Sequence, residues 1–282
     1  MVIGVDLGGT KVRAGVAVNG EVRDQTQQLI NSRGSQSETL GQLMDMIRPL
    51  MTSGIVGIGL GVPSVVDIAR GIVYNVVNIP SWGCVPLKDI LEAEFSVPVS
   101  VNNDVNCFAL GEQRFGRLKG FRDAVGITSG TGVGSGIIIN NSLYPGRNCG
   151  AGEIGLLSYR DHNLEYYASG NFFPAMHQVS AIRAHDLASS GDETALKWWR
   201  EFGEHMGQVI KTVVYTYDPE AIVIGGSLSK AFNFFQQAML DSLQDFSYPE
   251  SIRRLKIFQS VNEDITLLGA AALIGPQHAS AV

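Results

Sequence analysis

VIGVDLGGTKVRAGVAVNG at residues 2–20 and DAVGITSGTGVGSGIIIN at residues 123–140 follow one pattern of strand, Gly-rich tip and second strand. In the first, Asn19-Gly20 is the dipeptide preferred for a tight hairpin turn. Two copies of one β-hairpin, each with a Gly-Thr at its tip, predict a duplicated architecture with a cleft between the copies. Chance similarity of two glycine-rich hairpins is the open alternative. At an offset of 121 residues the windows share Gly9/Gly130, Thr10/Thr131, Val12/Val133, Gly15/Gly136 and Asn19/Asn140.

The rest of the chain alternates between helix-like and strand-like segments. Ser35-x-x-Glu38 resembles a helix capping box, and apolar residues with helical spacing follow it from Leu40 to Met51. A long amphipathic helix is expected from Ala195 to Tyr217. This alternation predicts the α/β class. Further strands are expected at 55–62, 97–101, 221–226 and 255–261, and further helices at 86–95, 105–115, 229–243 and 267–275.

The composition is that of a globular protein acting on small molecules. The chain has 282 residues, of which 45% are hydrophobic and 17% charged. A net charge of −6 without a basic run gives no electrostatic footprint for nucleic acid. Three widely spaced cysteines indicate a reducing compartment, and the N-terminus shows neither a signal peptide nor a membrane span. We therefore expect a cytoplasmic protein with neither nucleic-acid nor membrane partners.

The first Gly-Thr tip offers groups that bind phosphate. Gly8 and Gly9 let backbone N–H groups approach a polyanion, while Thr10 and Lys11 supply a hydroxyl and a cation. Asp6, at the end of a buried strand, is suited to hold Mg²⁺ directly or through water. The alternative is a hairpin whose glycines serve only for their positive φ angles.

The second Gly-Thr tip carries the same kinds of phosphate-binding groups as the first, and two such tips facing each other suggest a triphosphate clamp. Gly130, Thr131 and Gly132 again supply backbone donors and a hydroxyl. Gly225 and Gly226 follow an apolar strand and precede a helix, where a strand end can approach a flat nucleotide closely. A simple strand-to-helix turn explains these two glycines equally well.

Four polar residues are candidates for holding and activating a hydroxylated substrate. Asp104 is placed to accept a proton from a substrate hydroxyl while Asn103 orients the substrate. Glu153 lies among small residues, and Glu165 lies at an expected helix start; paired acids are suitable acceptors for hexose hydroxyls. Without context, an N-cap is the favoured interpretation of Asp104, and a solvated surface position that of each glutamate.

Eight segments in order give the chain a family resemblance over nearly its whole length. The segments are DLGGTK (6–11), GLGVPSVVD (59–67), NIPSW (78–82), VPVSVNNDVNCFALGE (97–112), GITSGTGVGSGII (126–138), GAGEIG (150–155), LEYYASG (164–170) and IVIGGSLS (222–229). Together they resemble the ROK family (repressors, open reading frames, kinases) of the sugar-kinase/actin superfamily.

The resemblance implies a two-domain actin-like ATPase (ribonuclease H-like) α/β fold with a deep inter-domain cleft. Residues 1–106, joined by a C-terminal helix at 266–282, would form the smaller N-terminal domain, and residues 107–265 the larger one. ATP would be held by both Gly-Thr tips, with adenosine lined by Gly225 and Gly226. A homodimer is also implied. The aromatic stretches at 171–177 and 232–239 are either its contact area or part of the core.

The implied activity is that of an ATP-dependent hexose kinase acting on the 6-hydroxyl of glucose or a close relative. Carried over by position, Asp104 resembles the catalytic base and Asp6 the carboxylate on the Mg²⁺ side. The residues that resemble the sugar pocket are Asn78, Asn103, Glu153 and Glu165.

Two departures from the family pattern concern the sugar pocket. Leu156 stands where family kinases have a His, and the segment 158–163 has no Cys where they have a zinc-binding loop. Zinc is therefore not expected, and fructose, allose or an N-acetylhexosamine are alternative acceptors.

A non-catalytic sugar-sensing regulator is the alternative of a different class. ROK repressors carry an N-terminal DNA-binding motif, but only Met1 precedes the first strand here, so we expect none. Retention of Asn102-Asn103-Asp104 and both Gly-Thr tips favours the kinase, because a sensor does not need a phosphate clamp.

Overall fold

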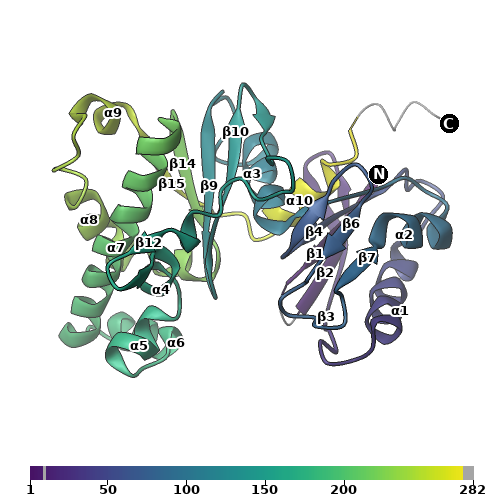
Figure 1. Ribbon diagram of the computed structural model, residues 1–282, viewed down its shortest axis with the longest axis horizontal. Helices are drawn as coiled ribbons and strands as arrows, with labels where there is room; N and C mark the ends of the chain where they lie inside the picture. Colours follow the sequence, from purple (N-terminus) through teal and green to yellow (C-terminus); the bar gives the residue numbers. More distant parts are fainter. Residues whose placement is uncertain (9–10, 276–282) are drawn as a thin grey trace.

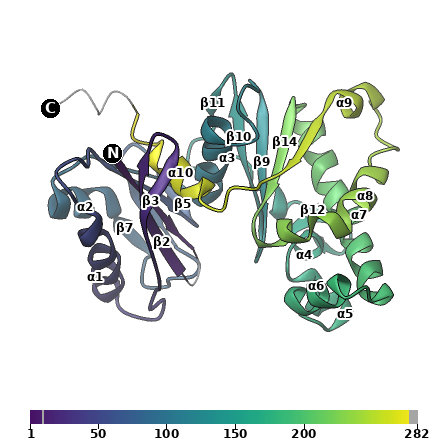
Figure 2. The ribbon, with the colours of Figure 1, turned by 180° about the vertical axis from the view of Figure 1, so that it is seen from behind.

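The computed structural model describes residues 1–8 and 11–275 and has two lobes on either side of a central helix pair (Figure 1). A mixed β-sheet forms the centre of each lobe. The helices α3 (Asp104–Phe115) and α10 (Ile265–Ala271) lie between the two sheets, which the reverse view also shows (Figure 2).

The first lobe is built on a sheet with strand order β3-β2-β1-β4-β8. β1 pairs antiparallel with β2 and parallel with β4, which pairs parallel with β8. A smaller antiparallel sheet β5-β6-β7 accompanies it. The elements are β1 (Val2–Leu7), β2 (Lys11–Val18), β3 (Glu21–Leu29), α1 (Gln36–Ile47), η1 (Arg48–Leu50), β4 (Ile58–Val62), β5 (Val65–Asp67), β6 (Ile72–Tyr74), β7 (Cys84–Pro86), α2 (Leu87–Phe95) and β8 (Val99–Asn103).

The second lobe repeats this topology in its sheet β11-β10-β9-β14-β15. β9 pairs antiparallel with β10 and parallel with β14, which pairs parallel with β15. The strands are β9 (Ala124–Ser129), β10 (Val133–Ile139), β11 (Ser142–Leu143), β12 (Ser158–Tyr159), β13 (His162–Asn163), β14 (Ala221–Gly225) and β15 (Lys256–Gln259). The helices are η2 (Ile154–Leu156), α4 (Leu164–Ala168), α5 (Phe172–His177), α6 (Ala181–Ser189), α7 (Glu193–Tyr217), η3 (Ser227–Ala231), α8 (Phe232–Asp241) and α9 (Pro249–Arg254).

The shared topology confirms the duplicated architecture predicted from the two hairpins. The copies differ at their tips. Leu7 pairs with Val12 around residues 8–11, whereas Ser129 pairs with Val133 around residues 130–132, so the second tip is one residue shorter. In both copies motif residues stand at the carboxyl end of a parallel strand: Asn103-Asp104 where β8 ends and Gly225-Gly226 where β14 ends.

The central helices are in backbone-to-backbone contact. A Cβ on Gly269 of α10 would lie 1.8 Å from the carbonyl oxygen of Cys107 in α3, and one on Gly59 of β4 would lie 1.8 Å from the carbonyl oxygen of Ala270. α10 therefore packs tightly on both α3 and the first sheet. The predicted boundary between residues 106 and 107 falls inside α3, and residues 276–282 lie outside the described residues, so the domain division stays a prediction.

The apolar cores explain the aromatic stretches. Phe172, Phe173 and Phe235 are fully buried beside Trp199 and Phe202 of α7. Of the two interpretations left open for 171–177 and 232–239, core packing is the one that these phenylalanines follow. Their hydrophobic burial, of about 1.5–3 kcal/mol for each large side chain, holds α5 and α8 on the long helix α7.

Candidate active site

The turn from β8 into α3 places a carboxylate at the edge of the first sheet where β8 ends. Asn103 is the N-cap of α3, because its side-chain oxygen accepts hydrogen bonds from the backbone N–H groups of Val105 at 2.8 Å and Asn106 at 3.2 Å. Asp104 is the first helical residue, and its carboxylate accepts from Val105 N–H at 3.0 Å. The capping role that the sequence left open for Asp104 is therefore filled by Asn103.

Several carboxylates lie near one another at this edge and shift one another's pKa. Burial first, and then the charges of Asp6 and Glu153, raise the pKa of Asp104 to about 7, against the opposing backbone hydrogen bonds. Burial raises the pKa of Asp6, with Arg13 opposing. Partial desolvation of the carboxyl group, followed by the charge of Glu165, raises the pKa of Glu153, although the residue as a whole stays exposed. A carboxylate with a pKa near neutrality is suited to accept a proton at physiological pH.

The two candidate sugar-binding glutamates come from the second lobe. Glu153 is exposed and directly precedes η2, while Glu165 is half-buried in the first turn of α4. The carboxylate of Glu165 accepts from Val133 N–H at 2.9 Å. A Cβ on Gly132 would lie 2.4 Å from the Glu165 carboxylate, so this glycine leaves the room that the carboxylate occupies.

Asn102 ties the two lobes' parts of the site together, a role not predicted from the sequence. Its side-chain oxygen accepts from Asn103 N–H at 2.8 Å, from Asn106 Nδ2 at 3.0 Å and from the Cys149 thiol at 3.2 Å. Cys149 belongs to the loop that leads to Glu153. The only available signal was that Asn102 precedes Asn103-Asp104 at the end of a buried strand.

The second Gly-Thr tip is a compact loop held by backbone hydrogen bonds. Gly130 N–H donates to Gly132 at 3.0 Å, and Gly170 N–H donates to the Gly130 carbonyl at 2.7 Å. Thr131 is exposed at the tip. Asn171 Nδ2 donates to the Thr131 carbonyl at 3.3 Å.

In the first tip, Gly8 N–H donates to the Lys11 carbonyl at 2.8 Å, and Lys11 is exposed. The predicted phosphate contacts of Gly9 and Thr10 lie outside the described residues.

A pocket of about 860 Å³ lies between the lobes beside Gly225 and Gly226. Gly226 has φ +82°, and a Cβ there would lie 2.3 Å from the Ser129 carbonyl oxygen; one on Gly225 would lie 2.4 Å from the Phe108 ring. Internal packing thus already requires both glycines, and both also line the pocket. Its lining includes none of the candidate carboxylates Asp6, Asp104, Glu153 and Glu165.

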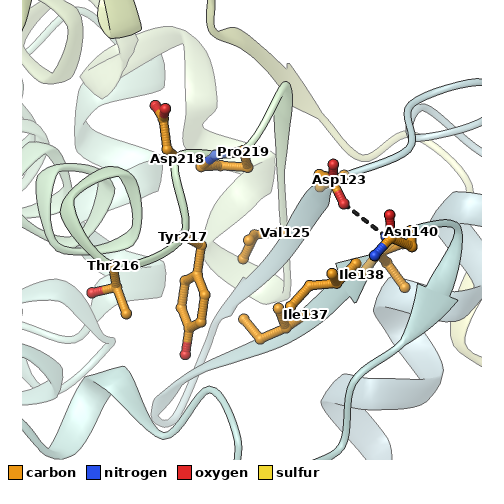
Figure 3. A pocket seen from close by; sticks show the side chains of 11 residues that line it. Asp123, Val125, Ile137, Ile138, Asn140, Thr216, Tyr217, Asp218 and Pro219 are labelled. Carbon is orange, nitrogen blue, oxygen red and sulfur yellow. Dashed lines mark hydrogen bonds between the residues drawn. The ribbon is translucent and has the colours of Figure 1, made fainter.

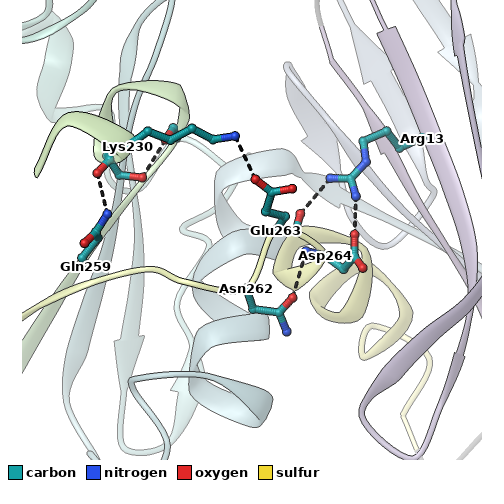
Figure 4. A network of polar contacts seen from close by, with 8 residues as sticks. Arg13, Lys230, Gln259, Asn262, Glu263 and Asp264 are labelled. Atoms are coloured by element: carbon teal, nitrogen blue, oxygen red, sulfur yellow. Dashed lines mark hydrogen bonds and ion pairs between the residues drawn. The ribbon is translucent and has the colours of Figure 1, made fainter. Parts of the chain in front are cut away.

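Charged residues that sequence reasoning missed form one wall of this pocket (Figure 4). Arg13 donates to the Glu263 carbonyl at 2.8 Å and forms an ion pair with Asp264. Lys230 forms an ion pair with Glu263 at 2.8 Å. These contacts join residues that are far apart in the chain, so no local sequence pattern predicts them.

Asn78 and Leu156 lie on the periphery of this arrangement. Asn78 is exposed in the turn between β6 and β7, and within residues 1–8 and 11–275 no hydrogen bond joins its side chain to the carboxylates. Leu156 is 62% exposed, and its N–H donates to the Glu153 carbonyl at 3.3 Å. It therefore presents an apolar side chain one 3₁₀ turn away from Glu153.

A second pocket lies at the opposite edge of the second sheet and is separate from the site (Figure 3). It has about 350 Å³ and is lined by the start of β9, the end of β10 and the turn before β14. Asp123 accepts there from Asn140 N–H at 2.7 Å. None of the candidate site residues lines it.

Two further surveys concern the described residues alone. Among them, no cluster of three or more His, Cys, Asp or Glu side chains is arranged to hold a metal ion. No helix in the same part of the chain has the length and apolarity needed to cross a membrane.

The fold and the placement of the motifs define a class. Two sheets of equal topology around a helix pair, with carboxylates and Gly-rich segments at the ends of their strands, are the actin-like ATPase fold of the sugar kinases. The family model "ROK family" matches residues 2–276, and the chain belongs to the ROK family.

Three relatives illustrate what this chain resembles. The glucokinase of Halalkalibacterium halodurans is 29% identical, over 99% of this chain and 96% of its own. The xylose repressor of Caldicellulosiruptor bescii is 27% identical, over 97% of this chain and 77% of its own. A ROK family glucokinase from Streptomyces griseus, solved in complex with glucose and AMPPNP, superposes with a TM-score of 0.82 at 26% identity, over 96% and 98% of the two chains.

Proposed function

We propose that this ATP-dependent sugar kinase transfers the γ-phosphate to the 6-hydroxyl of glucose or a close relative, with Asp104 as the base. The observation that carries the proposal is the placement of Asp104 in the turn from β8 into α3, where the carboxylates of Asp6 and Glu153 are close enough for their charges to act on it. The Streptomyces griseus relative, which binds glucose and AMPPNP, supports the choice of substrates.

In the proposed mechanism, positioning and charge do most of the work, as is usual for phosphoryl transfer. Glu153 and Glu165 accept hydrogen bonds from sugar hydroxyls, and Asn103 contributes to the same pocket. Asp104 takes the proton as the hydroxyl oxygen attacks in line. The two Gly-Thr tips donate backbone N–H groups to the phosphates. The pocket beside Gly225 and Gly226 receives the adenosine.

Magnesium fits these residues when it arrives with ATP. Mg²⁺ is usually held by one or two carboxylates together with waters and substrate phosphates. Asp6 offers one such carboxylate close to Asp104. When bound, the ion would neutralise charge on the phosphates. We propose that no zinc is required, because segment 158–163 contains no Cys.

The test is a coupled assay of ADP release with MgATP against a panel of hexoses and N-acetylhexosamines. Sugar-dependent turnover is expected, and Asp104→Asn should lower kcat by about 10²–10⁴-fold, the usual contribution of a general base. Sugar binding to the variant, followed by titration calorimetry, should largely persist. Turnover by Asp104→Asn at the wild-type rate would remove Asp104 from the role.

The acceptor depends on the pocket wall near Glu153. Fructose, allose or an N-acetylhexosamine are alternatives to glucose, because Leu156 gives an apolar surface where a polar side chain would read a hydroxyl. The same panel decides between them by kcat/KM.

A sugar-sensing regulator without catalytic activity is the second candidate, and the Caldicellulosiruptor bescii xylose repressor among the relatives is the observation that favours it. Sugar binding without turnover on any member of the panel is its expected signature. We also propose that the protein is cytoplasmic and that it forms a homodimer. Size-exclusion chromatography with light scattering would test the homodimer by its molar mass.

A further inference from the structure

The hairpin of β12 and β13 lies between the two candidate sugar-binding glutamates along the chain. Glu153 directly precedes η2, and Glu165 is the second residue of α4, so η2 and the hairpin connect them. β12 and β13 pair through Ser158 with Asn163 and Tyr159 with His162. The Leu164 N–H donates to the Leu157 carbonyl at 3.0 Å and closes the base of the hairpin against α4.

Four consecutive hairpin residues contact the two tyrosines that follow Glu165. Tyr159 packs edge-on against Tyr167, with ring centroids 5.4 Å apart, and His162 stacks on Tyr166 at 3.9 Å. The Arg160 guanidinium lies 5.5 Å from the ring centroids of both Tyr159 and Tyr167. Asp161 accepts a hydrogen bond from the Tyr167 hydroxyl. We call this set, residues 159–162 with Tyr166 and Tyr167, the tyrosine clamp.

The tyrosine clamp rests on the core of the second lobe. Tyr159 Oη and His205 Nδ1 are hydrogen-bonded at 3.2 Å, and the Tyr167 ring lies 4.9 Å from the His205 ring. His205 is buried in α7, and burial, with the charge of Arg160, lowers its pKa to about 4. The imidazole is therefore neutral at physiological pH and serves as a fixed support for both tyrosines.

We propose that the tyrosine clamp is a positioning device that holds Glu165, and through the hairpin Glu153, in the geometry that binds the sugar. This inference rests on the proposed function. Tyr166 and Tyr167 follow Glu165 directly in one short helix, so contacts that fix these two side chains also fix the α4 backbone from which the Glu165 carboxylate reaches Val133 N–H, 2.9 Å away. Aromatic pairs and a hydroxyl–carboxylate hydrogen bond give the hairpin a defined orientation on α4.

The clamp contacts α4 and α7, while the 860 Å³ pocket beside Gly225 and Gly226 has no clamp residue in its lining. Disturbing the clamp should therefore weaken the binding of sugar much more than the binding of MgATP. A residue that supports only overall folding would affect both substrates together.

The experiment compares Asp161→Ala, Asp161→Asn and Tyr167→Phe, each with sugar KM, MgATP KM, kcat and sugar Kd by titration calorimetry. Asp161→Ala and Tyr167→Phe lose the hydrogen bond, so sugar KM and sugar Kd are expected to rise about threefold to tenfold, with MgATP KM within about twofold of wild type. Asp161→Asn keeps an acceptor oxygen and should recover most of the sugar affinity.

Tyr215→Phe is the matched control, because Tyr215 also loses a hydroxyl hydrogen bond, to Ser247 at 2.9 Å, but lies at the far end of α7. Unchanged sugar Kd in Asp161→Ala and Tyr167→Phe, or an equal rise in both KM values, would overturn the positioning role. The sugar Kd is measured directly and does not depend on turnover. A wild-type protein that binds sugar without turnover would therefore contradict the proposed kinase activity, while the Kd values of the variants would still test the positioning role of the clamp.

Discussion

At the scale of single residues, burial and the charges of Asp6 and Glu153 act on the carboxyl group of Asp104. They raise its pKa to about 7. A base must be deprotonated to accept a proton, so kcat/KM for the sugar is expected to rise with pH through about 7 and level off above it. The measurement is kcat/KM from about pH 5.5 to 9 in the coupled assay. A profile that is flat below neutrality would contradict the assignment.

The same pKa predicts how Asp104 affects folding. The unfolded carboxyl ionises near 3.8 and the folded one near 7, so between these values the folded state binds more protons. Its contribution to stability is present at low pH and falls as pH rises through this window. Asp104→Asn removes the buried charge and should raise the free energy of unfolding by about 1–3 kcal/mol at about pH 8, with little change near pH 4.

Urea unfolding at both pH values measures this difference. Asp186→Asn, on the exposed face of α6, is the matched control and should change little at either pH. Equal effects of Asp104→Asn at both pH values would mean that the carboxyl is not titrating between the folded and unfolded states.

The sequence predicted the carboxylates but not what holds them. Asp6, Asp104, Glu153 and Glu165 stand in motifs, and the structure makes them neighbours. The contact of Arg13 with Asp264 spans 251 residues and has no local pattern. The roles assigned to the motif residues stay predictions.

At the scale of elements, helices and strands with a clear capping motif or apolar pattern were predicted from the sequence, and those without such a signal were missed. The capping box at Ser35 and Glu38 is confirmed, with both reciprocal hydrogen bonds present, as are the long helix α7 and the buried strands β4 and β14. The polar strand β3 was missed because its residues are mostly exposed and show no apolar alternation. The hairpin β12–β13 was missed because each strand has only two residues.

Helix α10 offers a test of close packing between elements. Gly269→Ala would place a Cβ 1.8 Å from the Cys107 carbonyl oxygen and 2.7 Å from the Gly111 nitrogen, both backbone atoms of α3. The helices must move apart, so we expect a loss of about 1–3 kcal/mol or more in the free energy of unfolding. Urea denaturation followed by circular dichroism measures it.

Gly41→Ala is the matched control for that substitution. Gly41 lies inside α1, and a Cβ there would meet nothing within 4 Å. The alanine should therefore stabilise the protein by about 0.4–1 kcal/mol through the entropy of the unfolded chain. If Gly269→Ala were as stable as Gly41→Ala, α3 and α10 would not be in backbone contact.

For the molecule as a whole, the segment 260–264 between β15 and α10 crosses from one lobe to the other along the large pocket (Figure 4). Arg13, from the first sheet, forms an ion pair with Asp264 and donates a hydrogen bond to the Glu263 carbonyl. Lys230, from the second lobe, forms an ion pair with the Glu263 side chain. Each lobe thus contributes one cation that forms an ion pair with the segment 260–264.

Removing these cations should loosen the crossing and favour an open cleft. For Arg13→Ala combined with Lys230→Ala we expect a larger radius of gyration by small-angle X-ray scattering in the absence of ligand. The open state binds nucleotide less well, so MgATP KM should rise by about threefold. Lys230 and Glu263 are exposed, so salt should screen their ion pair in the wild type as well. The differences in radius of gyration and MgATP KM between Lys230→Ala and wild type should therefore shrink near 0.5 M salt, where the screening length is about 4–5 Å.

Arg48→Ala is the control, because it breaks ion pairs with Asp45 and Glu94 inside the first lobe alone. It should change neither the radius of gyration nor MgATP KM. If the double variant matched Arg48→Ala in both measurements, the crossing would be held by the packing of α10 rather than by its charges.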